Sequence, residues 1–271
     1  MTAVSSLDLY ALRSLLFLPA SNPRAIMHAR NSGADLVILD LEDSVRPEDK
    51  DAARDAAVAA VGEDWPMPLA IRINSPHTDW HGLDIGAVML AKPDLIVVPR
   101  AAGKEEIAFV RNQTGKPVAA MVETAKGLVS IHETAREAAA LIAGTNDLAA
   151  DLRLPPGAGR KPLQMALQTI VLAARAAGVA VFDGVFNGLD DEEGFTAEAR
   201  EGRGLGFDGK SLIHPQQVAP CHAAFAATEE ELARAERLVA AASGGAERFE
   251  GVMIERMHVE AAERVLERAR R

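Results

Sequence analysis

The chain has 271 residues, of which 48% are hydrophobic and 25% are charged, a balance typical of a globular protein with a sizeable core. Its formal net charge of -10 argues against broad contact with nucleic acid or anionic membranes, which need clustered positive charge, and leaves small metabolites as candidate ligands. The sequence has no apolar run of about 18 residues and no signal-peptide pattern, so we expect a cytoplasmic protein without a membrane span.

Short β-branched runs alternate with longer Ala-rich amphipathic runs, a pattern typical of strand–helix units around a parallel sheet. Eight strands are predicted, over Leu15–Leu18, Leu36–Leu39, Leu69–Ile73, Leu95–Val98, Val118–Val122, Ala140–Ala143, Val179–Phe182 and Phe207–Leu212. Helices are predicted over Pro23–Ser32, Pro47–Val61, Lys104–Asn112, Gly127–Glu137, Leu163–Ala177, Glu192–Gly204 and Pro215–Ala224, and after Trp80. Eight such units close into a (β/α)8 TIM barrel, whereas a doubly wound sheet normally needs fewer strands.

Two further helices, Glu229–Ala242 and Val259–Arg270, exceed what a barrel needs. We therefore expect residues 1–226 to form the barrel and residues 227–271 to form a C-terminal helical extension of the same domain. The extension is either a helix pair that packs on its own barrel or an arm that caps a neighbouring subunit.

In such a barrel the active site lies at the carboxyl ends of the strands, so polar residues there are functional candidates. The candidates in chain order are Arg13, Asp40, Glu42, Asp43, Arg72, Asn74, Arg100, Glu123, Asn146, Asp147, Asp183, Lys210 and His214. For His214 a structural role is favoured. Arg13 precedes its strand, so its membership depends on how far its side chain reaches.

Two acids, Glu123 and Asp147, follow apolar runs on neighbouring strands. An ionised carboxylate in such a place is unfavourable unless it is paired or bound to a cation. Two hard oxygen ligands without a histidine or cysteine beside them suit Mg²⁺, completed by water and substrate oxygens. The alternative is a pair of salt-bridged structural carboxylates.

Three acids, Asp40, Glu42 and Asp43, fall within four positions, where full ionisation requires cations nearby. Arg13, Arg72 and Lys50 are the candidate cations, and a solvated acidic turn is the alternative. Arg72 lies within an apolar strand, where an arginine needs an anionic partner. That partner is the acid cluster, the substrate or both.

These residues fall in six ordered motifs that resemble the citrate lyase β-subunit-like branch of the HpcH/HpaI aldolase superfamily over about residues 13–226. The motifs are Arg13–Pro19, Gly33–Asp35 with Leu39–Val45, Arg72–Asn74, Val122–Gly127, Gly144–Leu148 and Gly206–Gln217.

The resemblance implies a homo-oligomeric barrel, a trimer or hexamer, that acts on a small-molecule thioester of coenzyme A or of an acyl carrier protein. It implies that Glu123 and Asp147 hold Mg²⁺, with Gly144 and Asn146 also at the substrate. It further implies that Arg13 and Arg72, with the acid cluster, bind and polarise the reacting acid.

The implied reaction is cleavage, or formation, of a carbon–carbon bond in a 3-hydroxyacyl thioester such as citramalyl-CoA, malyl-CoA or a citryl thioester. A base removes the hydroxyl proton, and the departing thioester carbon becomes an enolate that must be stabilised. The products are a keto acid and an acetyl thioester.

The sequence departs from the family pattern where some relatives supply a catalytic aspartate from the C-terminal segment to a neighbouring subunit. Here Glu255 stands at that place. Pro99-Arg100 also replaces a common Pro-Lys after the fourth strand. Two alternatives remain open: an aldolase that acts on free 2-keto-acid aldols, and a barrel without activity that serves as a partner subunit.

Overall fold

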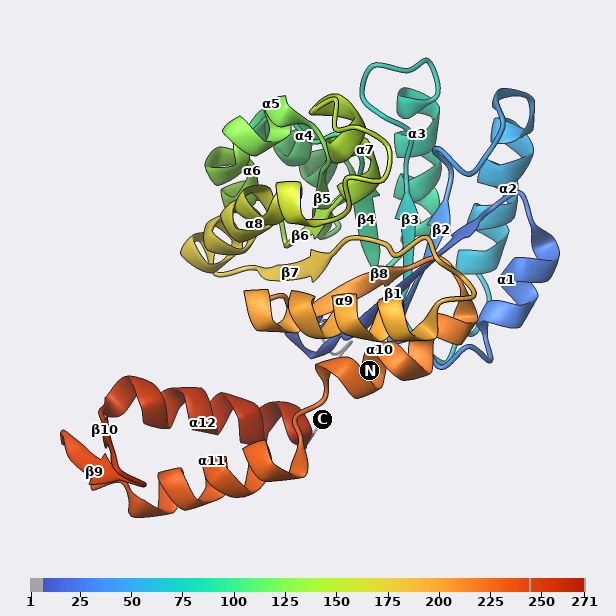
Figure 1. Ribbon diagram of the computed structural model, residues 1–271. Helices are drawn as coiled ribbons and strands as arrows, with labels where there is room; N and C mark the ends of the chain where they lie inside the picture. The colour runs from blue at the N-terminus through green and yellow to red at the C-terminus, as the bar shows by residue number, and fades with distance from the viewer. Residues whose placement is uncertain (1–6, 244, 271) are drawn as a thin grey trace. The chain divides into compact units, whose positions relative to one another are not determined.

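A computed structural model describes residues 7–243 and 245–270 of the chain. The chain divides between Ala224 and Phe225 into two compact units. Figure 1 shows the eight barrel strands and most of the helices in the first unit, and two helices with two short strands in the second.

The first unit is a closed barrel of eight parallel strands, which confirms the predicted fold class. The strands are β1 (Ser14–Pro19), β2 (Leu36–Asp40), β3 (Leu69–Arg72), β4 (Leu95–Val98), β5 (Val118–Val122), β6 (Ala140–Ala143), β7 (Ala180–Asp183) and β8 (Gly209–Leu212). Each strand pairs with its neighbours in sequence, and β8 closes the barrel by pairing Lys210 with Ser14. All eight predicted strands are therefore present.

The barrel helices are α1 (Pro23–Ala29), α2 (Lys50–Val61), α3 (His81–Ala91), α4 (Lys104–Thr114), α5 (Ala125–Val129), α6 (Ile131–Glu137), α7 (Thr145–Asp151), α8 (Gln164–Ala177), α9 (Glu192–Leu205) and α10 (Val218–Phe225). The prediction missed α7, which begins immediately after β6, and merged α5 with α6. Both misses arise in short helices, in which too few turns exist to show a helical period.

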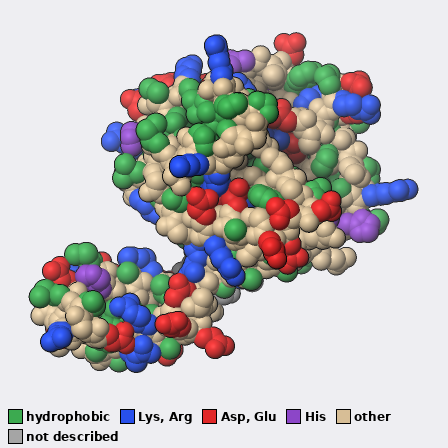
Figure 2. Space-filling model, in the orientation of Figure 1, with side chains coloured by type: hydrophobic (Ala, Val, Ile, Leu, Met, Phe, Trp, Pro, Cys, Tyr) green, Lys and Arg blue, Asp and Glu red, His purple; other side chains and the backbone are tan. Residues whose placement is uncertain are grey.

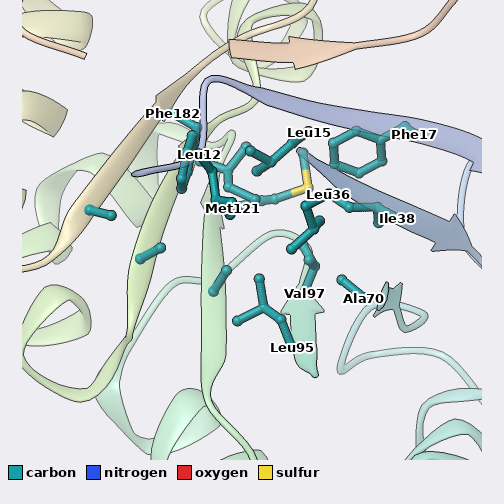
Figure 3. Packing of buried hydrophobic residues seen from close by; sticks show 14 residues of the cluster. Leu12, Leu15, Phe17, Leu36, Ile38, Ala70, Leu95, Val97, Met121 and Phe182 are labelled. Atoms are coloured by element: carbon teal, nitrogen blue, oxygen red, sulfur yellow. The ribbon is translucent and has the colours of Figure 1, made fainter. Parts of the chain in front are cut away.

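The barrel interior is filled by side chains that alternate along the strands (Figure 3). Leu15, Leu36, Leu95 and their neighbours are fully buried there. Phe17 and Met121 belong to the same cluster but retain slight exposure, 9% and 7%. These two side chains therefore form the boundary between the apolar core and the polar end of the barrel.

The second unit consists of α11 (Glu229–Ala241), the hairpin strands β9 (Glu247–Phe249) and β10 (Val252–Ile254), and α12 (Arg256–Ala269). Thr228 and Glu231 form a capping box at the start of α11. Ala235, Leu238 and Ile254 pack in a small core of this unit. The hairpin was not predicted; it turns through Glu250 and Gly251, both of positive φ, and three-residue strands give too short a pattern to detect.

The distribution of surface charge and the lengths of the helices can be compared with the expectation of no nucleic-acid or membrane partner. Lys and Arg side chains are scattered among acidic and uncharged ones on the face that Figure 2 shows. No helix among the described residues is long and apolar enough to cross a membrane.

Candidate active site

A cavity of about 440 Å³ opens at the carboxyl ends of the barrel strands. Its charged lining residues come from β2, β3, β5 and the start of α7, or directly follow these strands; they are Asp40, Asp43, Arg72, Glu123 and Asp147. The fold therefore brings Arg72 and the two predicted metal-binding acids, Glu123 and Asp147, to one cavity.

Arg72 is fixed at the last position of β3 by Asp40, its register partner at the end of β2. Arg72 Nε donates to Asp40 Oδ1 at 2.6 Å and Nη2 donates to Oδ2 at 2.7 Å, a bidentate pair. The third guanidinium nitrogen, Nη1, lies 3.1 Å from Glu42 Oε2. The guanidinium also lies over the ring of Phe17, 5.2 Å from its centroid. Arg72 therefore has little freedom to rotate, and its charge is preorganised.

This pairing fixes the charges of both partners. Burial opposes the charge of Arg72, but the carboxylates of Asp40 and Glu42 raise its pKa above the ordinary value. Burial also opposes ionisation of Asp40, yet Arg72 and a hydrogen bond from Ser44 Oγ hold the pKa of Asp40 below its usual range. Arg72 is thus cationic, and Asp40 anionic, throughout the neutral pH range.

Glu42 behaves differently from Asp40. Burial raises the pKa of Glu42 to about 7; Arg72 lowers it, whereas the negative charges of Asp43 and Asp40 add to the rise. Arg72 does not outweigh these effects because its bidentate partner is Asp40. A carboxyl group that titrates near neutrality is suited to proton transfer.

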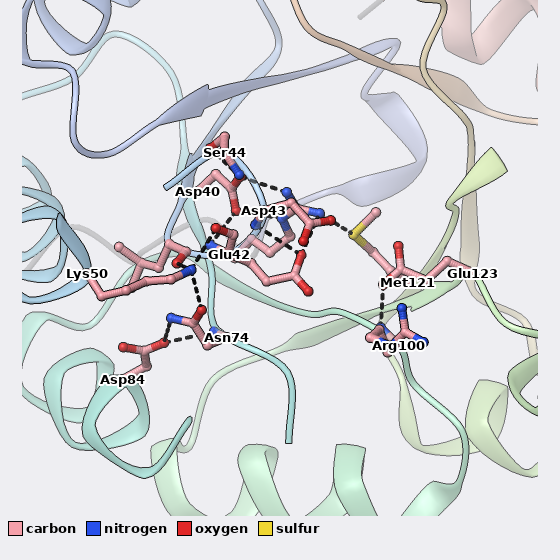
Figure 4. A network of polar contacts seen from close by, with 12 residues as sticks. Asp40, Glu42, Asp43, Ser44, Lys50, Asn74, Asp84, Arg100, Met121 and Glu123 are labelled. Carbon is pink, nitrogen blue, oxygen red and sulfur yellow. Dashed lines mark hydrogen bonds and ion pairs between the residues drawn. The ribbon is translucent and has the colours of Figure 1, made fainter. Parts of the chain in front are cut away.

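Lys50 fixes the backbone of the acidic turn that follows β2. Its Nζ donates to the carbonyl oxygens of Leu41 and Glu42 and to Asn74 Oδ1, each at 2.7 Å (Figure 4). Asn74 in turn donates to Asp84 at 2.7 Å. Lys50 was predicted as a counter-cation for the acid cluster; the structure shows that its hydrogen bonds go mainly to the backbone of the turn.

The protein provides few positive groups to stabilise the ionised forms of Glu123 and Asp147. Burial, followed by the charge of Glu42, raises the pKa of Glu123 to about 8, although its Oε1 accepts the backbone N–H of Arg100 at 2.5 Å. Burial and Asp43 raise the pKa of Asp147. The guanidinium of Arg100 lies 3.7 Å from Asp147, and both side chains are partly exposed, which weakens the pair.

This donor set fits Mg²⁺. Two hard carboxylates that follow the adjacent strands β5 and β6, both with raised pKa, favour a cation between them. Within the described parts of the chain, no three or more His, Cys, Asp or Glu side chains form a group that would hold a metal alone. That is consistent with Mg²⁺, which usually keeps several waters and takes substrate oxygens alongside one or two carboxylates.

The position of the Glu123 side chain requires a glycine at position 144, because no side chain fits there. A Cβ atom at Gly144 would lie 2.4 Å from Glu123 Cβ and 2.6 Å from its Oε2. The predicted substrate contact at Gly144 stays a prediction, but the glycine has a clear steric function. Asn146 also lines the cavity, and its side-chain amide forms two reciprocal hydrogen bonds with Asn187 (2.8 and 3.2 Å).

Arg13 does not join this cluster, contrary to expectation. It precedes β1 and so lies at the opposite end of the strand from Pro19, which lines the cavity. Its Nε and Nη2 each donate to Asp35 at 3.1 Å. The side chain of Arg13 therefore does not reach along the strand to the cavity, the condition on which its membership of the site depended.

Two other candidates at strand ends, and the C-terminal candidate Glu255, also have structural partners. Lys210 Nζ contacts Asp183 at 3.1 Å and Glu198 at 2.7 Å, in a buried network outside the cavity lining. His214 Nδ1 accepts the backbone N–H of Gln216 at 3.3 Å, as a helix cap. Glu255 lies in the second unit, at the start of α12, where its backbone N–H donates to His258.

Sequence reasoning missed several lining residues. Ser44, Met121 and Ser211 line the cavity. Ser44 and Met121 carry no chemical signal of their own in the sequence. For Ser211 a signal did exist: it alternates with Lys210 on the same strand, so the two side chains point to opposite faces.

Comparisons with known proteins agree with this geometry. The family model described as HpcH/HpaI aldolase/citrate lyase matches residues 13–215. A (3S)-malyl-CoA thioesterase from Cereibacter sphaeroides is 36% identical, covering 96% of this chain and 95% of the relative. A citrate lyase subunit beta from Leuconostoc mesenteroides subsp. cremoris is 34% identical, with 95% and 93% covered.

A solved structure of the protein CitE from Mycobacterium tuberculosis, in complex with magnesium, acetoacetate and coenzyme A, is 33% identical. It aligns with a TM-score of 0.86 over 97% of this chain and 100% of that one. Both the sequence over most of its length and the barrel with its cavity thus lead to one assignment: the chain belongs to the HpcH/HpaI aldolase/citrate lyase family.

Proposed function

We propose that this protein is a Mg²⁺-dependent carbon–carbon lyase that cleaves, or forms, a 3-hydroxyacyl-CoA thioester such as malyl-CoA, citramalyl-CoA or citryl-CoA. One observation carries the proposal: a buried, permanently cationic Arg72 shares a cavity with two carboxylates of raised pKa, Glu123 and Asp147. The names of the malyl-CoA and citrate lyase relatives, and the ligands of the CitE structure, support the substrate class.

Each charged group has a function in this proposal. Glu123 and Asp147 would hold Mg²⁺, which supplies positive charge for binding and polarising a hydroxy acid. Arg72 stabilises the negative charge that develops on the thioester enolate, because Asp40 and Glu42 hold its guanidinium in place.

The proton balance needs one base and one acid. The base takes the hydroxyl proton as the carbon–carbon bond breaks, and a proton returned to the enolate carbon gives the acetyl thioester. The proposed proton-transfer groups are Glu42 and Asp43 from the barrel unit and Glu255 from the second unit. Asp43 lines the cavity itself, whereas Glu42 lies 3.1 Å from Arg72 and has a pKa, about 7, that permits both proton uptake and release.

Hydrolysis of the thioester is a second candidate function. It is favoured by the name of the Cereibacter relative, a (3S)-malyl-CoA thioesterase that is 36% identical over nearly the full length. In this reaction water attacks the thioester carbonyl, and the products are the free hydroxy acid and CoA. The same cavity would bind the acid in both reactions, so the two functions are distinguished by identifying the reaction products.

Product analysis of malyl-CoA, citramalyl-CoA and citryl-CoA, with Mg²⁺ and with EDTA, tests both functions. We expect Mg²⁺-dependent formation of a keto acid and acetyl-CoA by the wild type, and loss of activity of about 100-fold or more in Glu123→Ala. A free hydroxy acid with CoA would establish the thioesterase instead. Turnover of free 2-keto-acid aldols, or of no substrate, would favour the aldolase or the partner subunit.

A further inference from the structure

One wall of the cavity is apolar except for a single hydroxyl group. This wall is formed by β1, β8 and the segment after β7, through Phe17, Leu18, Val185 and Ile213. Ser211 is the only residue with a polar side chain among the described residues that line this wall. The charged groups Arg72, Glu123 and Asp147 line the cavity from β3, from the residue after β5 and from the start of α7; the Arg72 guanidinium lies beside the apolar wall, 5.2 Å from the ring centroid of Phe17.

The orientation of Ser211 follows from strand alternation. Its neighbour Lys210 points away from the barrel interior, since Lys210 Nζ contacts Glu198 on α9. Successive side chains of a strand point to opposite faces, so Ser211 points inward. Its presence in the cavity lining agrees with this orientation.

The hydroxyl of Ser211 is buried without a partner. The residue is 1% exposed, and its Oγ has no hydrogen-bond partner among the described residues. Unpaired buried polar groups are rare, because burial removes water without replacing its hydrogen bond. Ser14, equally buried at the other end of the barrel, shows the usual arrangement: its Oγ bonds His222 at 2.8 Å and accepts the N–H of Asp35 at 2.9 Å.

We infer that Ser211 is a substrate-binding residue whose hydroxyl hydrogen-bonds a carboxylate or carbonyl oxygen of the acyl group. The inference rests on the proposed function, because it takes an oxygen-rich acyl group as the ligand. With apolar neighbours on the same wall, the site accepts an acyl group that is polar at one point and apolar around it. Ser211 thereby contributes to the choice among hydroxyacyl thioesters.

The test compares Ser211→Ala with Ser14→Ala, a matched removal of a buried hydroxyl. KM and kcat are measured for each thioester that the wild type turns over. Binding of glyoxylate, pyruvate and oxaloacetate in the presence of Mg²⁺ is measured by calorimetry, and Tm by circular dichroism. The binding measurement keeps the inference separate from the proposed function, since it needs no turnover.

We expect Ser211→Ala to raise KM, or the Kd of a bound keto acid, about 5- to 10-fold, the effect of one lost hydrogen bond. Its Tm should equal or exceed that of the wild type, because an unpaired hydroxyl stabilises nothing in the free protein. Ser14→Ala should do the reverse, with a lower Tm and unchanged KM.

Unchanged KM and Kd in Ser211→Ala would overturn the inference, whatever the wild-type reaction proves to be. A fall in Tm as large as that of Ser14→Ala would also overturn it, since the hydroxyl would then have a structural partner such as a bound water. Absence of turnover with retained keto-acid binding would contradict the proposed lyase but leave the Ser211 test decisive.

Discussion

At the scale of single residues, the site depends on how two anions respond to burial. Asp40 and Glu123 are both almost fully buried at strand ends, yet the pKa of Asp40 is lowered and that of Glu123 is raised to about 8. The difference is a partner: Asp40 has both oxygens on Arg72, whereas Glu123 has one backbone N–H from Arg100. The unbalanced carboxylate is the one proposed to bind Mg²⁺.

This imbalance predicts a pH dependence of stability. Glu123 titrates near 4.5 when unfolded and near 8 when folded, so the folded state binds more protons between these values. The free energy of unfolding therefore falls as pH rises through this window and levels off above it. Glu42, with a raised pKa of about 7, acts in the same direction. We expect the Tm of the EDTA-treated protein to fall by roughly 3 to 8 °C between pH 5 and pH 8.

Mg²⁺ should reverse this loss, because it replaces the missing positive charge only where the carboxylates are ionised. The expected increase in Tm is larger at pH 8 than at pH 5. Glu123→Gln is the control: it should flatten the pH dependence and abolish the Mg²⁺ effect. An increase in Tm of equal size at both pH values would place the binding of Mg²⁺ elsewhere.

At the scale of elements, the ends of the strands could be predicted from the sequence, but the conformation of the segments that follow them could not. The apolar run before Glu123 and the one before Asp147 predicted two strands with carboxylates at their ends, and the register of the barrel brings them together. α7, which starts at Thr145, is too short to show a helical period. The hydrogen bonds of Lys50 join a helix to the carbonyl oxygens of the preceding turn, Leu41 and Glu42. No local pattern encodes such contacts.

The turn after β4 illustrates this limit and gives a further prediction. Arg100 has a left-handed backbone conformation, with φ of 51°, which directs its N–H to Glu123. Arg100→Gly removes the guanidinium near Asp147 but favours this backbone, whereas Arg100→Val removes the same charge and disfavours it. We expect Mn²⁺ affinity of Arg100→Gly within about 3-fold of the wild type and that of Arg100→Val about 10-fold weaker.

Electron paramagnetic resonance of free Mn²⁺ measures both affinities, and circular dichroism monitors the fold. Equal affinities in the Gly and Val variants would show that only the charge of Arg100 matters. A large loss in Arg100→Gly would show that the guanidinium, rather than the backbone, organises the two carboxylates.

At the scale of the whole molecule, the alternation of strands and helices determined the fold class, because eight units leave few ways to close a parallel sheet. The second unit was predicted only as two helices. Its hairpin, which leads into Glu255, was absent from the prediction. The subunit arrangement that the family resemblance implies stays a prediction, and Glu255 provides a way to test it.

If Glu255 acts in the active site of a neighbouring subunit, two inactive variants should restore activity together. Glu255→Ala and Glu123→Ala, co-expressed with different tags and purified through both, form mixed oligomers in which some sites combine an intact Glu123 with an intact Glu255. We expect activity well above that of either variant alone, and light scattering should show an oligomer. Glu255→Asp, which keeps the carboxylate, should retain activity. Mixed oligomers no more active than their parents would instead place Glu255 in its own subunit's site or outside catalysis.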